Sequence, residues 1–272
     1  MPTVAANGVN LFYKESGSGP ETIVFAHGLL MDHTMFEPQR AAFEKQYRVI
    51  AYDLRAQGQS QDTCRGYDMD TQAEDAAALV QALHAAPCHF AGLSMGGFIG
   101  MRLAARHPEL VRTLTLMNTT AAKEKPANRL RYGLMAQIVK MTGPAPFTPI
   151  AAKELFGRST RASAEKRAMR QEWTARLRAR PKNIAYSVLA VMNRREFRAD
   201  EMAAIRCPVL IITGEDDTAQ PPRNSGPLSA GIRGAKLVQV PRAGHSSALE
   251  SPDAVIAAMH ELFQRATLSK SS

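Results

Sequence analysis

The chain has 272 residues, of which 45% are hydrophobic and 22% charged, so it is long enough to bury the core of a globular domain. It contains no apolar run of membrane-spanning length and does not open with a secretory leader, so we expect a cytoplasmic protein with no membrane partner. The cysteines Cys64, Cys88 and Cys207 form no CxxC pair, which argues against a disulfide framework and a metal site. No cofactor is expected.

The predicted elements alternate between strands and helices along most of the chain. A short strand at Val9–Lys14 is followed by the apolar run Thr22–Ala26, which is typical of a strand that is buried on both faces of a parallel sheet. Further strands are predicted at Tyr47–Tyr52, Cys88–Ala91, Leu110–Met117, Val209–Thr213 and Lys236–Val240. Helices are predicted near Met35–Lys45, Thr71–His84, Pro222–Gly231 and Pro252–Ala266, and after Ser94 as far as His107. This order predicts an α/β fold with a mostly parallel, doubly wound sheet, and the polar tail Thr267–Ser272 is predicted to be disordered.

The alternation stops between residues 121 and 200, where no strand is predicted. Two sets of apolar residues lie at helical spacing there: Leu130, Leu134, Ile138 and Met141, and Met169, Trp173 and Leu177. Because the sheet pattern resumes at Pro208, we predict that residues 121–200 form a helical cap. The cap would be inserted into a core domain of residues 1–120 and 201–272.

The charge of the chain is concentrated in this predicted cap. Residues 121–200 hold 12 Arg and 6 Lys against 5 Glu and 1 Asp, a net charge of +12 in a chain whose total is +9. One interpretation is a set of solvated Arg-rich helices, and the other is a positive surface that attracts an anionic substrate. The segment has one Trp and matches no recognition motif, so no nucleic acid partner is expected.

A G-x-S-x-G pattern, Gly92-Leu93-Ser94-Met95-Gly96, provides the candidate nucleophile. It follows a predicted buried strand and precedes a predicted helix, which is the setting of a nucleophile elbow. The flanking glycines leave room for the sharp turn that would raise the serine hydroxyl above the sheet. We therefore interpret Ser94 as the nucleophile of a hydrolase.

A serine hydroxyl needs a base to accept its proton, and the base needs an acid to orient it. His245 lies in a glycine-containing loop after the last predicted strand, at the same edge of the sheet as Ser94. Glu215, Asp216 and Asp217 follow a neighbouring predicted strand and compete for the role of the acid. The chain order serine, acid, histidine agrees with this assignment.

The negative oxygen of a tetrahedral intermediate needs preorganised N–H donors. One donor is expected to be the backbone N–H of Met95, the residue after the serine. The second is expected from the loop that follows Thr22–Ala26, where Leu29 is preferred and Leu30 is the alternative. The neighbouring His27 is interpreted as structural.

Several separate motifs resemble those of the α/β-hydrolase superfamily, over essentially the whole chain. They are His27-Gly28, Gly92–Gly97, Gly214–Asp217 and Ala243–His245. In that family the acid usually ends a G-x-x-D stretch, so the resemblance selects Asp217. The segment Asp53–Ser60 resembles a loop of the family in which Gly and His are common where Ala56 and Gln57 stand here, and it is interpreted as structural.

The elbow is similar to those of small bacterial esterases and of 3-oxoadipate enol-lactonases, and Ala26–Leu30 fits the esterases better. The resemblance implies hydrolysis of a small-molecule carboxylic ester or lactone through an acyl-serine intermediate. One alternative is a C–C bond hydrolase of the meta-cleavage-product type on the same triad. Another is a receptor of this fold that binds a ligand and turns it over slowly. The sequence indicates neither the natural substrate nor the oligomeric state.

Overall fold

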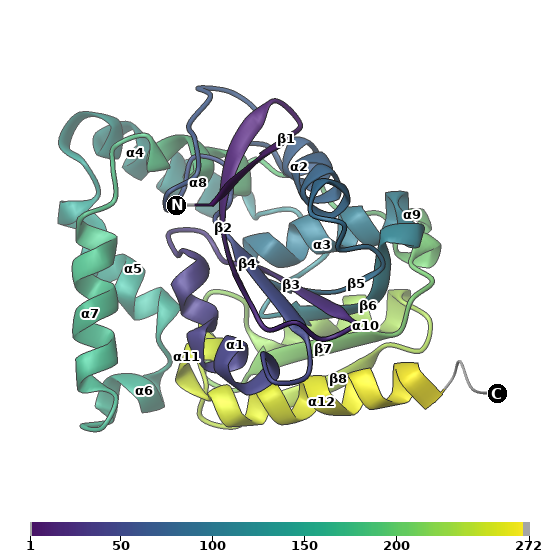
Figure 1. Ribbon diagram of the computed structural model, residues 1–272. Coiled ribbons are helices and arrows are strands. Elements are labelled where there is room, and N and C mark those ends of the chain that lie inside the picture. The colour runs from purple at the N-terminus through teal and green to yellow at the C-terminus, as the bar shows by residue number, and fades with distance from the viewer. Residues whose placement is uncertain (1, 269–272) are drawn as a thin grey trace.

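The computed structural model describes residues 2–268, and its centre is a single sheet of eight strands (Figure 1). The strands are β1 (Thr3–Ala6), β2 (Val9–Ser16), β3 (Thr22–Ala26), β4 (Arg48–Tyr52), β5 (Cys88–Leu93), β6 (Val111–Met117), β7 (Val209–Gly214) and β8 (Lys236–Val240). They lie in the order β1-β2-β4-β3-β5-β6-β7-β8, in which the pairs β1–β2 and β2–β4 are antiparallel and the five other pairs are parallel. The predicted α/β architecture with a mostly parallel sheet is confirmed.

Helices cover both faces of this sheet, because every residue of β3, β5 and β7 is buried and needs apolar partners on both sides (Figure 1). One apolar cluster joins the sheet to α1 (Glu37–Phe43), α11 (Ser247–Glu250) and α12 (Pro252–Leu268). The other joins it to α2 (Met69–Ala82), α3 (Met95–Arg106) and α10 (Gly226–Gly231). Short 3-10 turns complete the core: η1 (His33–Phe36), η2 (Pro108–Leu110) and η4 (Pro222–Ser225).

The C-terminal helix reaches further than the sequence pattern predicts. Because α12 continues to Leu268, residues 267 and 268 are helical rather than disordered. The rest of the predicted disordered tail, residues 269–272, lies outside the described residues. No helix within residues 2–268 has an apolar stretch long enough to cross a bilayer.

The segment between β6 and β7 is helical in the structure. It contains α4 (Pro126–Thr142), η3 (Ala145–Phe147), α5 (Thr148–Leu155), α6 (Arg158–Ala162), α7 (Arg167–Arg178), α8 (Ile184–Met192) and α9 (Ala199–Ala204). Helices α4, α5 and α7 stand at one side of the sheet, on the left in Figure 1. The division of the chain into a core and a cap of residues 121–200 stays a prediction, and "cap helices" below means α4 to α8.

The two apolar stripes predicted in this segment have different environments. On α7, Trp173 and Leu177 are buried against the core. On α4, Leu130 is 67% exposed and Met141 is 68% exposed, so this stripe faces away from the protein. Helical spacing predicted both helices, but α4 packs through the opposite face, which includes Val139.

Much of the positive charge of the cap helices is used in contacts within the protein. Arg161 and Arg170 donate hydrogen bonds to backbone carbonyls of the same segment. Arg176 and Arg180 both form ion pairs with Asp32 on the core, at 3.5 and 2.7 Å.

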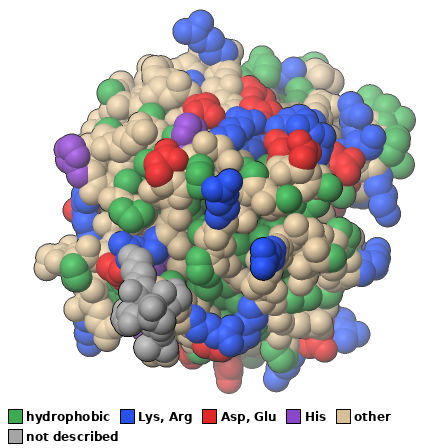
Figure 2. Space-filling model, turned by 90° about the vertical axis from the view of Figure 1, so that its right-hand side faces the viewer, with side chains coloured by type: hydrophobic (Ala, Val, Ile, Leu, Met, Phe, Trp, Pro, Cys, Tyr) green, Lys and Arg blue, Asp and Glu red, His purple; other side chains and the backbone are tan. Residues whose placement is uncertain are grey.

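On the side of the molecule that carries α9 and the end of α12, Lys and Arg side chains are spread out with Asp and Glu among them (Figure 2).

Candidate active site

Ser94 occupies a strained turn between β5 and α3. Its backbone has φ of +51° and ψ of −106°, in a region that residues other than glycine rarely adopt. The glycines on either side are needed for this turn, because a Cβ on Gly92 would lie 2.2 Å from the Gly96 carbonyl oxygen and one on Gly96 would lie 2.1 Å from that of Ala26. The predicted sharp turn between strand and helix is therefore present.

His245 and Asp217 form a direct hydrogen bond at the carboxyl edge of the sheet. The His245 Nδ1 atom lies 2.9 Å from Asp217 Oδ2, and both side chains are buried. The backbone N–H of Gln220 donates to the other carboxylate oxygen at 2.8 Å. Because the carboxylate accepts from His245 Nδ1–H, the opposite ring nitrogen, Nε2, is left as the basic atom.

Burial favours the neutral form of the His245 ring, but its neighbouring carboxylates outweigh this effect. The charge and hydrogen bond of Asp217, together with the charges of Glu250 and Glu154, raise the pKa of His245 above its ordinary value. The ring is therefore a stronger base than a free imidazole. A serine hydroxyl has a very high pKa, so a stronger base helps to remove its proton.

Asn118 is a further residue at this site, and sequence reasoning did not find it. Its side-chain NH₂ donates to Asp217 Oδ2 at 2.9 Å and to the Gly244 carbonyl at 3.1 Å. Its own carbonyl oxygen accepts from the Ser247 hydroxyl at 2.5 Å. Asn118 thus holds the Asp217 carboxylate and the histidine loop together, and the only available signal was its position directly after β6.

The two other acidic candidates are engaged elsewhere. Asp216 Oδ2 accepts from the backbone N–H of Ser159 at 2.7 Å, and this bond ties α6 to the core. Glu215 accepts from the backbone N–H of Arg242 at 3.0 Å. Among the three candidates, Asp217 is the one that the structure brings to His245.

The expected N–H donors come from two segments: Leu29 lies in the loop after β3, and Met95 is the first residue of α3. Within residues 2–268, the backbone N–H groups of Leu29 and Met95 have no hydrogen-bond acceptor, so both can serve a ligand. The alternative donor, Leu30 N–H, is already bonded to Gln57 Oε1 at 2.9 Å. Gln57 also donates to the Met95 sulfur at 3.5 Å, so this side chain, which was interpreted only as structural, joins the two donor segments.

The buried side chain of His27 connects the loop after β3 to Leu54 through hydrogen bonds. One ring nitrogen, Nδ1, lies 2.8 Å from the Gly28 carbonyl oxygen, and Nε2 accepts from the Leu54 N–H at 2.9 Å. Burial lowers the pKa of His27, so the ring is neutral and Nδ1 carries the proton. The carbonyl it holds belongs to the same peptide unit as the Leu29 N–H, and His27 is therefore a structural residue that orients this donor.

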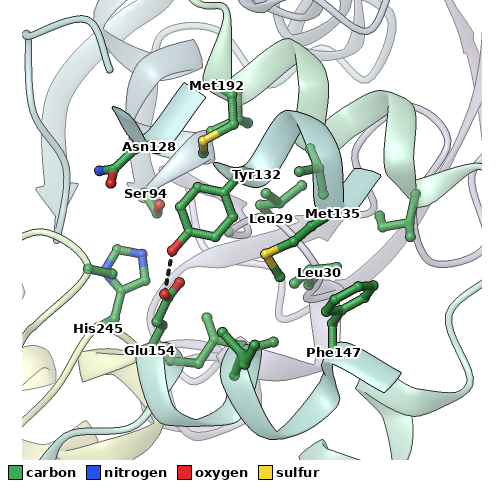
Figure 3. Close-up of a pocket in the computed structure, with 18 of the residues that line it drawn as sticks. Leu29, Leu30, Ser94, Asn128, Tyr132, Met135, Phe147, Glu154, Met192 and His245 are labelled. Atoms are coloured by element: carbon green, nitrogen blue, oxygen red, sulfur yellow. Dashed lines mark hydrogen bonds between the residues drawn. The ribbon is translucent and has the colours of Figure 1, made fainter. Parts of the chain in front are cut away.

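Ser94 and His245 line one cavity of about 330 Å³ beneath the cap helices (Figure 3). One end of the cavity is apolar and is formed mainly by α4, η3, α8 and the loop after β3. Its side chains include Leu29, Leu30, Met135, Val139, Phe147, Ile184 and Val188. A volume of this size is at the lower end of the range for small-molecule sites, so a short apolar group fits.

Four charged side chains line the same cavity, and their charges balance. Glu124 and Arg194 form an ion pair at 3.5 Å. Glu154 accepts a hydrogen bond from Tyr132, and the Arg131 guanidinium lies 5.2 Å from the centre of the Tyr132 ring. Among the described residues, no group of three or more His, Cys, Asp or Glu side chains is arranged to hold a metal ion.

The chain belongs to the alpha/beta hydrolase fold family, whose model matches residues 21–252. It is 31% identical over 256 residues to the AB hydrolase superfamily protein YisY of Bacillus subtilis (strain 168), with 91% of this chain and 92% of that protein covered. The predicted family and fold are confirmed, and so is the expectation that the protein is a hydrolase.

Two solved structures share this fold at similar levels of identity. A thermophilic esterase from Thermogutta terrifontis has a TM-score of 0.88 and 26% identity, with 97% of both chains covered. The enol-lactonase from Burkholderia xenovorans LB400 also has a TM-score of 0.88, with 27% identity and coverage of 97% of this chain and 100% of that chain.

Proposed function

We propose that this protein is a serine hydrolase that cleaves a carboxylic ester or lactone through an acyl-serine intermediate. The observation that carries the proposal is the geometry around one cavity: Ser94 on a strained elbow, and His245 bonded to the buried carboxylate of Asp217. The likeness to an esterase and an enol-lactonase supports the same chemistry. A cytoplasmic location remains part of the proposal.

In the proposed reaction, Ser94 Oγ attacks the carbonyl carbon while His245 Nε2 takes the hydroxyl proton. The resulting oxyanion accepts hydrogen bonds from the N–H groups of Leu29 and Met95. The bond to the leaving oxygen then breaks, and His245 gives its proton to the departing alcohol. A water molecule attacks the acyl-serine, His245 accepts its proton and then returns one to Ser94 Oγ as the acid is released.

The lining of the cavity supports a neutral substrate over the anionic one that the charge of the cap segment suggests. Arg131 and Arg194 are balanced by Glu124 and Glu154 within the cavity. The excess positive charge of the cap segment therefore lies largely outside it. An apolar acyl group fits the end of the cavity beside Leu29.

A panel of p-nitrophenyl esters tests the proposed activity. We expect rapid hydrolysis of short acyl chains, a decline in kcat/KM once the chain exceeds the apolar end, and an acyl adduct of Ser94 in rapid-quench mass spectra. Turnover of a vinylogous 1,5-diketone without ester hydrolysis would favour the C–C bond hydrolase. Tight ligand binding without turnover of either class would favour the receptor.

Arg180 links the cap segment to the loop that carries the Leu29 N–H. Its Nε donates to the Leu30 carbonyl at 2.9 Å, and a terminal nitrogen donates to Asp32 at 2.7 Å. Burial opposes ionisation of Asp32, but hydrogen bonds from Thr34 and Arg180 lower its pKa to about 2, so the ion pair is present at neutral pH. The loop is thus fixed from the cap as well as from the core.

We expect Arg180→Met to lower kcat for ester hydrolysis by about tenfold to a hundredfold, because small displacements of a reacting group are costly. KM should change less, since the apolar end of the cavity is intact. Arg178→Met is the matched control, because Arg178 is an exposed neighbour at the end of α7. Steady-state kinetics of both variants would contradict the role of Arg180 if the two gave equal kcat values.

A further inference from the structure

Glu154 presents an unused hydrogen-bond acceptor to the cavity. The Tyr132 hydroxyl donates to its carboxylate, and it is the only hydrogen-bond partner of that carboxylate among the described residues. Burial and the nearby Glu154 charge raise the pKa of Tyr132 well above its usual value, so the hydroxyl stays protonated and remains a donor. An ionised carboxylate has about four acceptor positions, so most of its capacity is free for a ligand.

The Glu154 carboxylate lies at the end of the cavity that holds His245. Figure 3 shows Glu154, from α5, and Tyr132, from α4, meeting between His245 and the apolar end that holds Leu30 and Phe147. Glu154 is also one of the three carboxylates, with Asp217 and Glu250, whose charge acts on the His245 ring.

The direction of the proposed reaction assigns a part of the substrate to each end of the cavity. His245 gives its proton to the leaving oxygen, so the alcohol portion of an ester lies beside His245 and within reach of Glu154. The acyl portion, whose carbonyl oxygen faces the Leu29 N–H, extends along the apolar side chains. A carboxylate at this end of the cavity favours a substrate whose alcohol portion carries a hydrogen-bond donor, and it repels a substrate whose alcohol portion carries an anion.

We propose that Glu154, oriented by Tyr132, binds a hydroxyl group on the alcohol portion of the substrate. The preferred substrates would then be esters of a diol or polyol with a short aliphatic acid. This inference rests on the proposed ester hydrolysis and adds its substrate class. Esters with a carboxylate in the same place would be poor substrates.

Matched esters that differ by one group test this substrate class. 2-Hydroxyethyl butyrate and propyl butyrate have nearly the same size but differ by a hydroxyl on the alcohol, and carboxymethyl butyrate carries an anion there. Ethyl 3-hydroxybutyrate and ethyl 3-methylbutyrate form the corresponding pair on the acyl side. We expect kcat/KM for 2-hydroxyethyl butyrate to exceed that for propyl butyrate by about tenfold or more, as for a hydrogen bond to a charged group.

Glu154→Gln replaces the charged acceptor with a weaker neutral one, so it should lower that ratio to about threefold or less and should raise kcat/KM for carboxymethyl butyrate. It should also move the acidic limb of the pH profile of kcat/KM to lower pH. The reason is that the variant lacks one of the carboxylates that raise the pKa of His245. Tyr132→Phe keeps the charge, so it should weaken the hydroxyl preference while leaving that limb in place. Glu165→Gln, an exposed glutamate of the cap segment, is the matched control and should change neither property.

The alternatives give different results. A wild-type ratio near one, or a ratio that is as large in Glu154→Gln as in the wild type, overturns the hydroxyl subsite. The placement of the subsite beside His245 is overturned if Glu154 produces a preference for the hydroxyl in the acyl pair instead of the alcohol pair. It is also overturned if the acidic limb of the pH profile does not move in Glu154→Gln. Failure to hydrolyse any of the five esters overturns the proposed function itself, and the substrate class with it.

Discussion

Ser94→Ala is expected to lower kcat for ester hydrolysis by about a millionfold while leaving the fold intact, because the variant loses the only group that can form the acyl intermediate. The strained backbone is set by its neighbours rather than by the serine side chain: the Ser94 N–H donates to the Met117 carbonyl at 2.8 Å, and its carbonyl accepts from the Thr119 hydroxyl at 2.9 Å. Alanine keeps both bonds. Circular dichroism and thermal unfolding should therefore match those of the wild type.

Labelling with a serine-directed organophosphate provides the complementary measurement. Peptide mapping should place one adduct on Ser94, which borders the cavity next to the free N–H of Met95. Ser60 is a poor competitor because its hydroxyl is already bonded to the Phe12 N–H and to the Asp53 carbonyl. Ser246 is fully buried. An adduct on either of these two serines would contradict the assignment of the nucleophile.

The sheet and the residues at its carboxyl edge could be predicted because they depend on local chain chemistry. Apolar runs bounded by glycine identify strands that are buried on both faces, and parallel strands end at one edge. Ser94, Asp217 and His245 lie within five residues of the ends of β5, β7 and β8, so topology brings all three to one edge of the sheet. The strand that was missed, β1, is short and half exposed, and it pairs with β2 through a turn at Asn7-Gly8, where both residues have positive φ.

What the sequence could not predict comes from side chains that meet only after the chain has folded. Tyr132 and Glu154 are 22 residues apart on different helices, and Arg180 reaches Leu30 across 150 residues. Helical spacing identifies an apolar stripe but does not say what covers it, which is why the stripe of α4 can be exposed while that of α7 is buried. Net charge likewise does not say which arginines face a cavity.

Asp217→Asn is expected to lower kcat by about ten-thousandfold, because an amide in place of the carboxylate favours the wrong tautomer of His245 and no longer stabilises the imidazolium. The Gln220 N–H can still donate to the side-chain oxygen of the asparagine, whereas the amide NH₂ takes the place of Oδ2 and the hydrogen bond from Asn118 is lost. The charge of Asp217 also raises the pKa of His245. The residual activity should therefore show an acidic limb at lower pH than the wild type.

Asp216→Asn is the matched control, because Asp216 is the preceding residue and carries the same charge but bonds the Ser159 N–H of α6. An asparagine side-chain oxygen can still accept that hydrogen bond, so kcat should fall by about tenfold or less. Parallel kinetics and pH profiles of the two variants decide between the candidates. If Asp216→Asn were the more damaging substitution and moved the acidic limb, the orienting acid would be Asp216, and the 2.9 Å contact between Asp217 and His245 would be a structural hydrogen bond.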